Sequence, residues 1–518
     1  MALRDSVRSV LRYCASPASM KIGLAALRDR RRIERSPLFD ADWYMRENPG
    51  ARRAGAIPAM HYLTAGFRAG LDPSPRFCGR EYAALHGLAP DENPLAHYER
   101  RGRRRGLPTS FLEASGAAPV SREETLARLR AKAADGGPLR AVFFVASAAM
   151  FPARPLLDAM LADPLFEPRV AVVPDLRWPG RDPEPGRAAC ERELARDYPE
   201  FLFLRVFRDR AGAWPDLLAD ADLAVYPSPY DLSDFRYNPR WSVGRPFLPL
   251  HVNYGYYRSL YDRDLVAKQN YACFWKVFLE CDATLAEYRE HSILRGANAE
   301  LTGYVKMDRL AAFEAKRKPK ARKTVLVAPH HSVEGGLNDV LALSTFDRFA
   351  DFFAELPARY PQLDFVFRPH PFLLDVLRRP SQWGPERVDR WLMALRGRDN
   401  VRLSDGGDYF AEFAEADAIV QDCGSWLVEW FYTGRPCCYL LKQPSDADTK
   451  FAPLGRECLK RCHVACAPDD VDRFLRDVVL GGKDSKAEAR EAFRPSVMLN
   501  YPHAAAAALA SIRRDLGL

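Results

Sequence analysis

The chain lacks any hydrophobic run long enough to cross a membrane. Its longest nearly apolar stretch covers residues 141–151, whereas a membrane-spanning helix needs about 20 apolar residues. The N-terminal segment also lacks the unbroken apolar core of a secretory signal, because Arg4, Arg8 and Arg12 interrupt it. These two absences argue against an integral membrane or exported protein, and we expect the chain to be cytoplasmic.

A disulfide pattern is also missing. Eleven cysteines are scattered through 518 residues, and an odd number without a regular pattern is typical of reduced thiols. Cys458, Cys462 and Cys466 surround His463, but their spacing is also that of one helix stripe, so we do not expect a zinc site there. What is present is a globular composition, 47% hydrophobic and 28% charged, which excludes a mainly disordered or fibrous chain.

The surplus positive charge is confined to the N-terminal quarter. Residues 1–135 carry 24 Lys and Arg against 15 Asp and Glu, whereas the whole chain carries 76 against 68. Residues 1–35 form one basic segment with apolar residues at helical spacing between 3 and 14, and five arginines between 100 and 105 form a second cluster. We expect a basic amphipathic segment over 1–35 that, with this cluster, contacts an anionic membrane surface. A helix docked on the protein itself and a solvated charged face are the alternatives.

A sequence repeat follows this basic segment. The pair His61-Tyr62 recurs as His97-Tyr98, glycines follow both pairs at matching positions, and a proline comes shortly after the second glycine in each copy. Such a period is typical of a repeated supersecondary unit. We predict a helical two-repeat module over residues 36–135, in which both histidines pack beside aromatic residues and bind no metal.

Strand-like hydrophobic runs then alternate with helical segments. Residues 136–315 and 316–518 each show this alternation, and a proline-broken basic connector over 316–323 separates the two patterns. We predict two Rossmann-like α/β domains, each an open parallel sheet covered by helices. The predicted strands are 141–145, 170–173, 201–206, 223–226 and 247–252 in the first domain, and 324–328, 364–368, 418–421 and 437–441 in the second.

Three strands of the second domain end in polar residues. In parallel sheets of this kind, ligands bind at the carboxyl ends of the strands, where these residues are expected to meet. We predict one donor-binding site formed by His330, His331, Ser332, Arg368, His370, Asp422, Gly424 and Ser425.

The third strand end suits a phosphorylated ligand. Asp422 can cap a helix that begins near Ser425, and Gly424 lets a ligand approach the backbone closely. The N–H groups of the first helical turn attract an anion. Glu429 lies one turn further on the same helix face, where its carboxylate can accept hydrogen bonds from two ribose hydroxyls.

The other two strand ends add a cation and a titratable group. Arg368 offers a fork for phosphate oxygens, and His370 can act as a neutral base or, beside a diphosphate, as a cationic donor. No Asp-x-Asp pair that would hold a divalent metal stands at these strand ends. We therefore expect a site without metal or cofactor, which stabilises a leaving diphosphate through arginine, histidine and backbone N–H groups.

Four segments in this order resemble the motifs of the CDP-glycerol glycerophosphotransferase family, whose members build teichoic-acid and capsule-type polymers on a GT-B fold. The segments are residues 302–310, 329–332, 368–371 and 422–429. The resemblance implies a GT-B arrangement of the two domains, and donor-binding roles for His370, Ser425 and Glu429, which takes the place of a family aspartate. The repeat module is similar to units attached to bacterial polysaccharide glycosyltransferases.

The acceptor side departs from the family pattern. There the family has a histidine base in a His-Gly pair, whereas the matching stretch here places Tyr254 before Gly255 and His251 three residues earlier. A tyrosine, with a pKa near 10, is a poor base at neutral pH. Either His251 has taken over this role or the acceptor chemistry differs.

Together these features predict a transferase in which residues 136–315 form the acceptor domain and residues 316–518 form the nucleotide-donor domain. It would move a polyol phosphate, with glycerol phosphate as the leading candidate, from a CDP-linked donor to a hydroxyl of a lipid-linked or growing cell-surface polymer. We expect it to act at the inner face of the cell membrane. The alternative is a GT-B glycosyltransferase that uses a CDP- or UDP-sugar, because both reactions use the same nucleotide pocket. A scaffold with a vestigial pocket is a third possibility, and no nucleic acid partner is expected.

Overall fold

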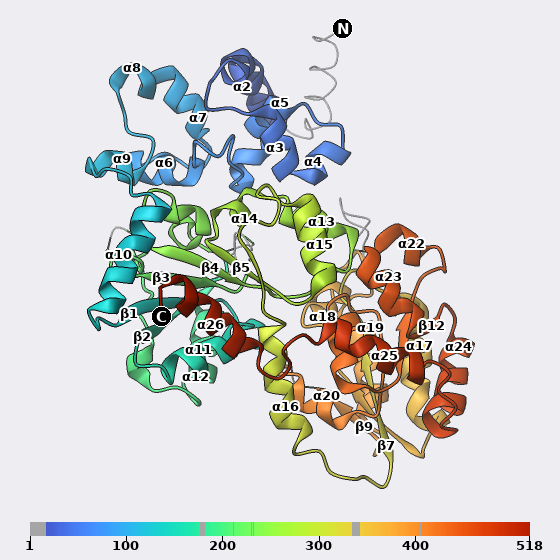
Figure 1. Cartoon of the computed structure of the whole chain (residues 1–518). Coiled ribbons are helices and arrows are strands. Elements are labelled where there is room, and N and C mark those ends of the chain that lie inside the picture. The colour runs from blue at the N-terminus through green and yellow to red at the C-terminus, as the bar shows by residue number, and fades with distance from the viewer. Residues whose placement is uncertain are drawn as a thin grey trace. The chain divides into compact units, whose positions relative to one another are not determined.

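The protein divides into two compact units (Figure 1). The computed structural model describes residues 17–176, 182–210, 212–228, 230, 233–333, 342–404 and 406–518, with side chains from residue 26 onward. The amphipathic pattern predicted over residues 3–14 lies outside this part. Of the helices described, none is both long and apolar enough to span a bilayer.

The first unit is helical. It extends to Thr125 and also takes in Asp234–Pro246 and Ala267–Cys273. Its α-helices are α2 (Pro17–Glu34), α3 (Ala41–Glu47), α4 (Pro49–Arg53), α5 (Pro58–His61), α6 (Gly79–His86), α7 (Pro94–His97), α8 (Arg103–Arg105), α9 (Phe111–Ser115) and α14 (Gln269–Cys273). The π-helical turns η1 (Tyr62–Gly66) and η3 (Tyr98–Gly102) follow α5 and α7, and the 3-10 turns are η2 (Phe67–Ala69), η6 (Phe235–Tyr237) and η7 (Pro239–Ser242).

The two sequence repeats fold alike around a tyrosine–histidine pair. The hydroxyl of Tyr44 lies 2.7 Å from Nδ1 of His61, and the hydroxyl of Tyr82 lies 2.9 Å from Nδ1 of His97. Burial lowers the pKa of both histidines, so neutral imidazoles serve these hydrogen bonds. The prediction that these two histidines are structural is confirmed.

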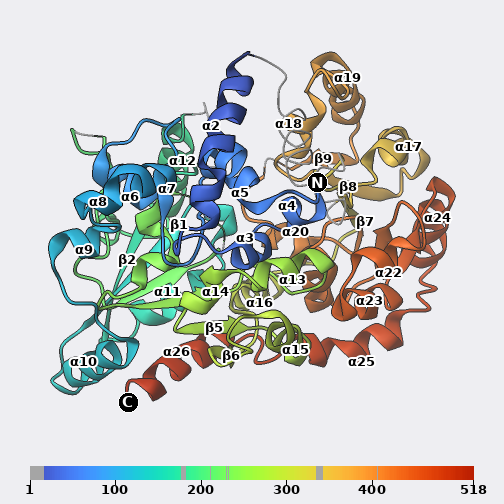
Figure 2. The same cartoon turned by 90° about the horizontal axis from the view of Figure 1, so that it is seen from above.

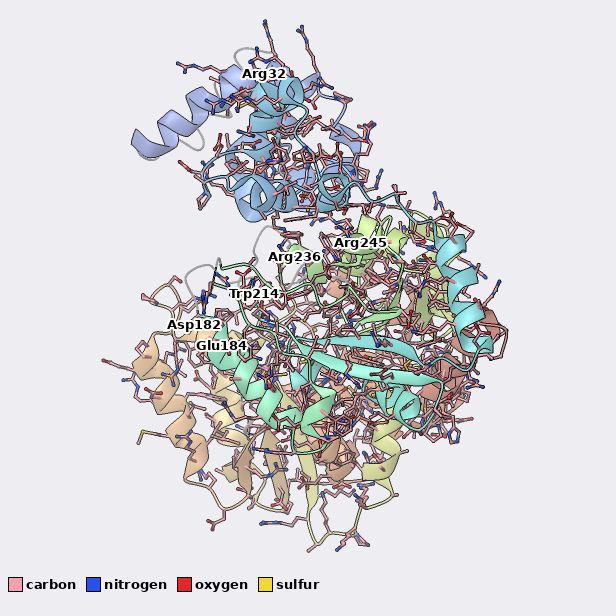
Figure 3. All side chains as sticks on the ribbon, turned by 90° about the vertical axis from the view of Figure 1, so that its left-hand side faces the viewer. Arg32, Asp182, Glu184, Trp214, Arg236 and Arg245 are labelled. Atoms are coloured by element: carbon pink, nitrogen blue, oxygen red, sulfur yellow. The ribbon has the colours of Figure 1, made fainter. Side chains whose placement is uncertain are left out.

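The segment Asp234–Pro246 belongs to the same unit because it makes polar and aromatic contacts with the repeats. Arg240 forms an ion pair of 2.6 Å with the buried Asp72. Arg236, drawn in Figure 3, lies over the ring of Phe111 at 5.4 Å, and Arg245 lies 3.7 Å from Glu81. An insertion from the middle of the chain thus completes the N-terminal module.

The second unit contains two parallel sheets of six strands each. The first sheet has the order β2-β1-β3-β4-β5-β6, and the second has the order β12-β11-β10-β7-β8-β9. The strands of the first are β1 (Leu139–Val145), β2 (Phe166–Val172), β3 (Leu223–Tyr226), β4 (Leu248–Val252), β5 (Lys276–Leu279) and β6 (Ala299–Leu301). Those of the second are β7 (Lys323–Ala328), β8 (Leu363–Phe367), β9 (Val401–Leu403), β10 (Ala418–Gln421), β11 (Cys437–Leu440) and β12 (His463–Ala465). The predicted fold class, a GT-B-like pair of Rossmann-like sheets, is confirmed.

One predicted strand is wrong, and four short strands were not predicted. Residues 201–206 form a 3-10 turn, η5 (Glu200–Leu202), and a single bridge between Phe203 and Val170 at the edge of β2. The exposed Phe201 and Phe207 explain why this hydrophobic run does not extend into the sheet. The strands that were missed are β5, β6, β9 and β12, of three or four residues each.

Helices cover both sheets, as Figures 1 and 2 show. Around the first sheet lie α10 (Arg122–Ala134), which begins in the first unit, and α11 (Arg154–Leu161), α12 (Glu184–Leu194), α13 (Leu260–Val266) and α15 (Asp282–His291), with the 3-10 turns η4 (Ala148–Met150) and η8 (Val305–Met307). The next helix, α16 (Asp308–Glu314), packs beside the second sheet, where Phe313 contacts Phe410. Around the second lie α17 (Phe346–Arg359), α18 (Leu373–Leu377), α19 (Pro385–Arg396), α20 (Phe410–Glu415), α21 (Trp426–Glu429), α22 (Asp446–Lys450), α23 (Pro453–Lys460), α24 (Pro468–Arg473) and α25 (Ala487–Val497), with the turns η10 (Trp430–Thr433) and η11 (Phe474–Leu480).

The last helix, α26 (Ala504–Asp515), returns to the first sheet. Its buried Ala508 and Ile512 belong to the same hydrophobic core as Leu157 of α11. Each sheet with its helices forms one half of the second unit. A second hydrophobic core is continuous between the halves, because Tyr304 and Met307 of the first half cluster with side chains of the second half. These contacts join the two halves into one compact unit.

The repeat module allows a matched test of its packing. Gly102 is helical, and a Cβ atom there would lie 2.6 Å from the Tyr82 hydroxyl and 2.8 Å from Cδ2 of Tyr98. We expect Gly102→Ala to lower the free energy of unfolding by roughly 1–3 kcal/mol, because the buried ring of Tyr82 must move. Gly50→Ala is the control, since a Cβ on this helical glycine meets nothing within 4 Å. Equal unfolding midpoints for the two variants in a denaturant titration would contradict this packing.

Candidate functional site

The predicted donor site surrounds the point where the strand order of the second sheet reverses. The chain runs outward from β7 to β8 on one side and from β10 to β11 on the other. In open α/β sheets the crevice beyond the carboxyl ends of the strands at such a point is where ligands bind. Residues 329–332 follow β7 and residues 422–425 follow β10, so both segments stand at this edge of the sheet.

Asp422 ties these two loops together. Its fully buried carboxylate accepts hydrogen bonds of 2.6 Å from the backbone N–H of His330 and of 2.6 Å from that of Thr345. Burial raises the pKa of Asp422 to about 6, although these hydrogen bonds act in the opposite direction. The predicted helix cap is therefore wrong, because the carboxylate is used between loops. Ser425 occupies the N-cap position of the four-residue α21, without a side-chain cap.

Three histidines gather beside this tie. The ring centroids of His331 and His370 lie 4.0 Å apart, and that of His330 lies 4.3 Å and 5.1 Å from them. Burial lowers the pKa of His370 to about 3, with His331 adding to the shift. The pKa values of His330 and His331 are also lowered by burial. Burial thus favours the neutral form of all three imidazoles.

Hydrogen bonds fix the orientation of two of these rings. Nδ1 of His330 lies 2.7 Å from Oγ of Ser332, which also accepts the backbone N–H of Leu343. Nδ1 of His370 accepts the backbone N–H of Phe372 at 3.2 Å, so the neutral ring carries its proton on Nε2. Ser332 thus has a supporting role, and His370 can present an N–H to a ligand.

The same cluster is one of two groups of described residues that bring three potential metal ligands together. Its ligand atoms lie within 4.8 Å of one another, as do those of the second group, Glu287, Glu290 and His291. In the histidine cluster, a metal on Nε2 of His370 would need the proton on Nδ1, where the Phe372 N–H already points. His463, which lies among Cys458, Cys462 and Cys466 in the sequence, has its Nε2 2.8 Å from Oδ1 of Asp484.

Arg368 does not offer a free fork. One of its nitrogens, Nη1, donates to Glu412 at 2.9 Å and to Oγ of Ser404 at 3.1 Å, and both Nη atoms contact backbone carbonyls of residues 406–408. The guanidinium is buried and its charge is balanced by Glu412. The predicted phosphate contact is therefore replaced by a structural one that holds the loop after β9.

Glu429 also has a different position from the one predicted. Its carboxylate is fully buried and accepts hydrogen bonds from Nζ of Lys306 at 3.2 Å and from the hydroxyl of Tyr409. The hydroxyl of Tyr304 lies 3.0 Å away. With its oxygens committed to these partners, Glu429 faces no space for a ribose, and the ribose contact is not supported.

The acceptor-side candidates separate clearly. His251 lies inside β4 with no exposed surface, stacks on Phe274 at 4.8 Å and has Nδ1 2.9 Å from the carbonyl oxygen of Tyr226. Burial lowers its pKa to about 4. His251 thus lies within the strand predicted over 247–252 and is enclosed in the sheet, which does not support its role as the acceptor-side base. Tyr254 comes after the strand and is half-buried, with the Lys306 ammonium 5.2 Å from its ring centroid.

Arg258 is the residue that sequence reasoning missed. It follows β4 in the first half, yet a Cβ atom at Gly424 would lie 2.7 Å from its Nη2 and 3.2 Å from its Nε. A glycine is therefore required at position 424, because the Arg258 guanidinium, and not a ligand as predicted, lies close to the backbone there. Ser425 lies near the same segment, since a Cβ at Gly255 would be 3.7 Å from its Oγ. The only signal in the sequence was an arginine shortly after the Tyr-Gly pair.

A separate cavity lies beside the edge strand β12. It has a volume of about 790 Å³ and mixed charge, with Arg456, Lys460 and Lys483 among its lining residues and Asp448 and Asp470 opposite in sign. It contains none of the predicted donor-site residues.

Comparisons with known proteins identify similar folds only. No protein-family model matches the chain, and no curated protein matches it. Solved structures similar to it include the UDP-GlcNAc 2-epimerase from Neisseria meningitidis bound to UDP-GlcNAc, at 12% identity over 73% of this chain and 100% of that one, with a TM-score of 0.46. The S. aureus MnaA–UDP structure has 14% identity over 74% and 97%, with a TM-score of 0.46. The wall teichoic acid polymerase TagF has 12% identity over 76% and 93%, with a TM-score of 0.48. Similarities of this size assign no activity, which has to be argued from the residues.

The Glu429–Lys306 pair can be tested by a double-mutant cycle. We expect Glu429→Gln to lower the free energy of unfolding by about 3–5 kcal/mol, because it leaves the buried Lys306 charge unpaired. Adding Lys306→Met should cost less than the sum of the two single changes. The control is Glu457→Gln, whose partner Lys460 is 67% exposed, and which should cost less than about 1 kcal/mol. Equal costs for Glu429→Gln and Glu457→Gln would show that the pair does not join the halves.

Proposed function

We propose that the chain is a transferase whose donor is linked to a nucleoside diphosphate, with CDP-glycerol as the preferred donor. It moves glycerol phosphate from this donor to a hydroxyl of a lipid-linked or growing polymer. The observation that carries this proposal is the gathering of three histidines, Gly424 and Ser425 at the switch point, where the strand order of the second sheet reverses. The ordered motif resemblance in residues 302–429 supports the choice of donor.

In the proposed reaction, an acceptor oxygen attacks the β-phosphorus of the donor. A bond forms from that oxygen to phosphorus, the bond from phosphorus to the bridging oxygen breaks, and CMP leaves with the electron pair. His370 suits the stabilisation of the leaving phosphate, because its Nε2–H is free to donate and a bound diphosphate favours its protonated form. The acceptor proton passes to a base or water on the side of the first sheet.

Tyr254 is the acceptor-side candidate that remains. It stands after β4 at the carboxyl edge of the first sheet, beside Lys306, whereas His251 is enclosed in the sheet. We propose that Tyr254 contacts the acceptor hydroxyl.

The alternative is a glycosyltransferase that uses a CDP- or UDP-sugar. The burial of His251 favours it, because a glycerophosphotransferase of the resembled family uses a histidine base at this edge. In this reaction the sugar carbon is attacked, and a nucleoside diphosphate leaves instead of a monophosphate.

The two functions differ in the nucleotide released. We expect the purified chain, given CDP-glycerol and a hydroxyl acceptor, to release CMP, and His370→Ala to lower this turnover on the order of 10²-fold. The control is His503→Ala, which changes an exposed histidine outside the site. Release of CDP or UDP from a sugar donor, with none of CMP from CDP-glycerol, would support the alternative. A chain that turns over neither donor would contradict both.

We further propose that the first unit binds an anionic membrane surface through its arginines. The buried Asp29 of α2 lies 2.8 Å from Nη1 of Arg32 and 2.9 Å from Nε of Arg100 in η3, so Arg32 of the basic segment lies beside Arg100 of the second cluster (Figure 3 labels Arg32). The remaining members of the patch are exposed: Arg28, Arg31, Arg35, Arg101, Arg103, Arg104 and Arg105.

Liposome flotation tests this surface. We expect binding to vesicles with anionic lipid that weakens with added salt, because the screening length shrinks to about 8 Å at physiological ionic strength. Arg101→Ser with Arg105→Ser should reduce binding, whereas the same charge change at Arg390 and Arg396 of α19 should not. Equal binding to neutral vesicles, or equal loss in both double variants, would contradict the proposal.

A further inference from the structure

Arg258 has a guanidinium that protein contacts satisfy on one side only. Nη1 donates to Oδ1 of Asp262 at 2.8 Å and to the carbonyl oxygen of Tyr256 at 3.1 Å. Nε is buried, and it has no hydrogen-bond partner among the described residues. An arginine N–H buried in this way lacks the hydrogen bond that normally offsets its loss of water.

The unsatisfied edge faces the turn after β10. Nη2 and Nε are the atoms nearest to the position that a side chain at Gly424 would occupy. This pair of N–H groups is the edge with which arginine binds two oxygens of a phosphate or carboxylate at once. The side chain as a whole is 16% exposed and its Nε is buried, so a ligand that binds this edge would be sheltered from water.

The pairing of the surrounding charges makes Arg258 the cation best suited to bind an anion at this edge of the sheet. Arg368 is paired with Glu412 and Lys306 with Glu429, and burial favours the neutral form of the three histidines. Arg258 is close enough to His330 to contribute to the lowered pKa of that histidine. The carboxylate that pairs with Arg258, Asp262, lies on the opposite side and holds the guanidinium in place.

We infer that Arg258 binds the diphosphate of the donor and does so from the first half of the unit, in the role that the sequence pattern assigns to Arg368. This inference rests on the proposed nucleotide donor. The donor would then contact both halves, with Ser425 and His370 on one side of the diphosphate and Arg258 on the other. Gly424 is needed because any larger residue would occupy the space in front of the guanidinium.

Calorimetric titration with CDP, UDP and cytidine tests this assignment. Arg258→Gln should weaken diphosphate binding roughly 10- to 100-fold and leave the affinity for cytidine unchanged, because cytidine has no phosphate. Arg258→Lys keeps the charge and one donor for Asp262 but loses the two-point edge, so it should fall between Arg258→Gln and wild type. The control is Arg263→Gln, which changes a neighbouring arginine paired with Glu287 and should alter neither affinity.

The outcomes separate this inference from the proposed function. Wild type that binds CDP or UDP, with Arg258→Gln and Arg258→Lys both unchanged, overturns the role of Arg258 alone. Equal losses for diphosphate and cytidine would indicate a folding defect and also overturn it. If the wild-type protein binds UDP but not CDP, the choice of a CDP-linked donor is wrong, and the role of Arg258 is then tested with UDP. If the wild-type protein binds neither nucleotide, the proposed donor and the role of Arg258 are both wrong.

Discussion

The buried carboxylate of Glu429 is the interaction on which the second unit depends. A carboxylate without contact with water is stable only when it is paired and hydrogen-bonded. Its partners come from both halves, with Lys306 and Tyr304 from the segment after β6 and Tyr409 from the second half. Breaking this group would leave a buried charge at the join, so it restrains how the halves meet.

This restraint determines what faces the switch point of the second sheet. Because Glu429 ends α21, the turn that precedes it is held against the first half, and Gly424 comes close to Arg258. The tie from Asp422 to the loop after β7 then positions His330 beside the same crevice. Two buried carboxylates therefore build the site without contacting a ligand, and the neutral histidines and Arg258 are left to do so.

The sequence predicted the fold well where hydrophobic runs were long. Eight of the nine predicted strands match strands of the structure, because a buried parallel strand shows as a continuous apolar run. The short strands β9 and β12 at the sheet edges carry too few apolar residues to be recognised. The run at 201–206 failed for the opposite reason, since its aromatic residues are partly exposed and pair with β2 at one point only.

Within the candidate site, the sequence identified which residues would gather but not what each would bind. Asp422 and Arg368 stand at strand ends and Glu429 on the helix after β10, as expected for a ligand site, yet each is used in a contact with a residue distant in the sequence. Such pairings depend on three-dimensional proximity that spacing does not reveal. Arg258 was missed for the same reason, because its neighbour Gly424 lies in the other half of the unit.

In the proposed function and the further inference, a nucleoside diphosphate binds between the halves at the point where the strand order of the second sheet reverses. A crystal structure of the chain soaked with CDP would show where it binds. We expect diphosphate density within hydrogen-bond distance of Arg258, Ser425 and His370. Density for the nucleotide in the cavity of about 790 Å³ beside β12, with the switch point empty, would contradict it.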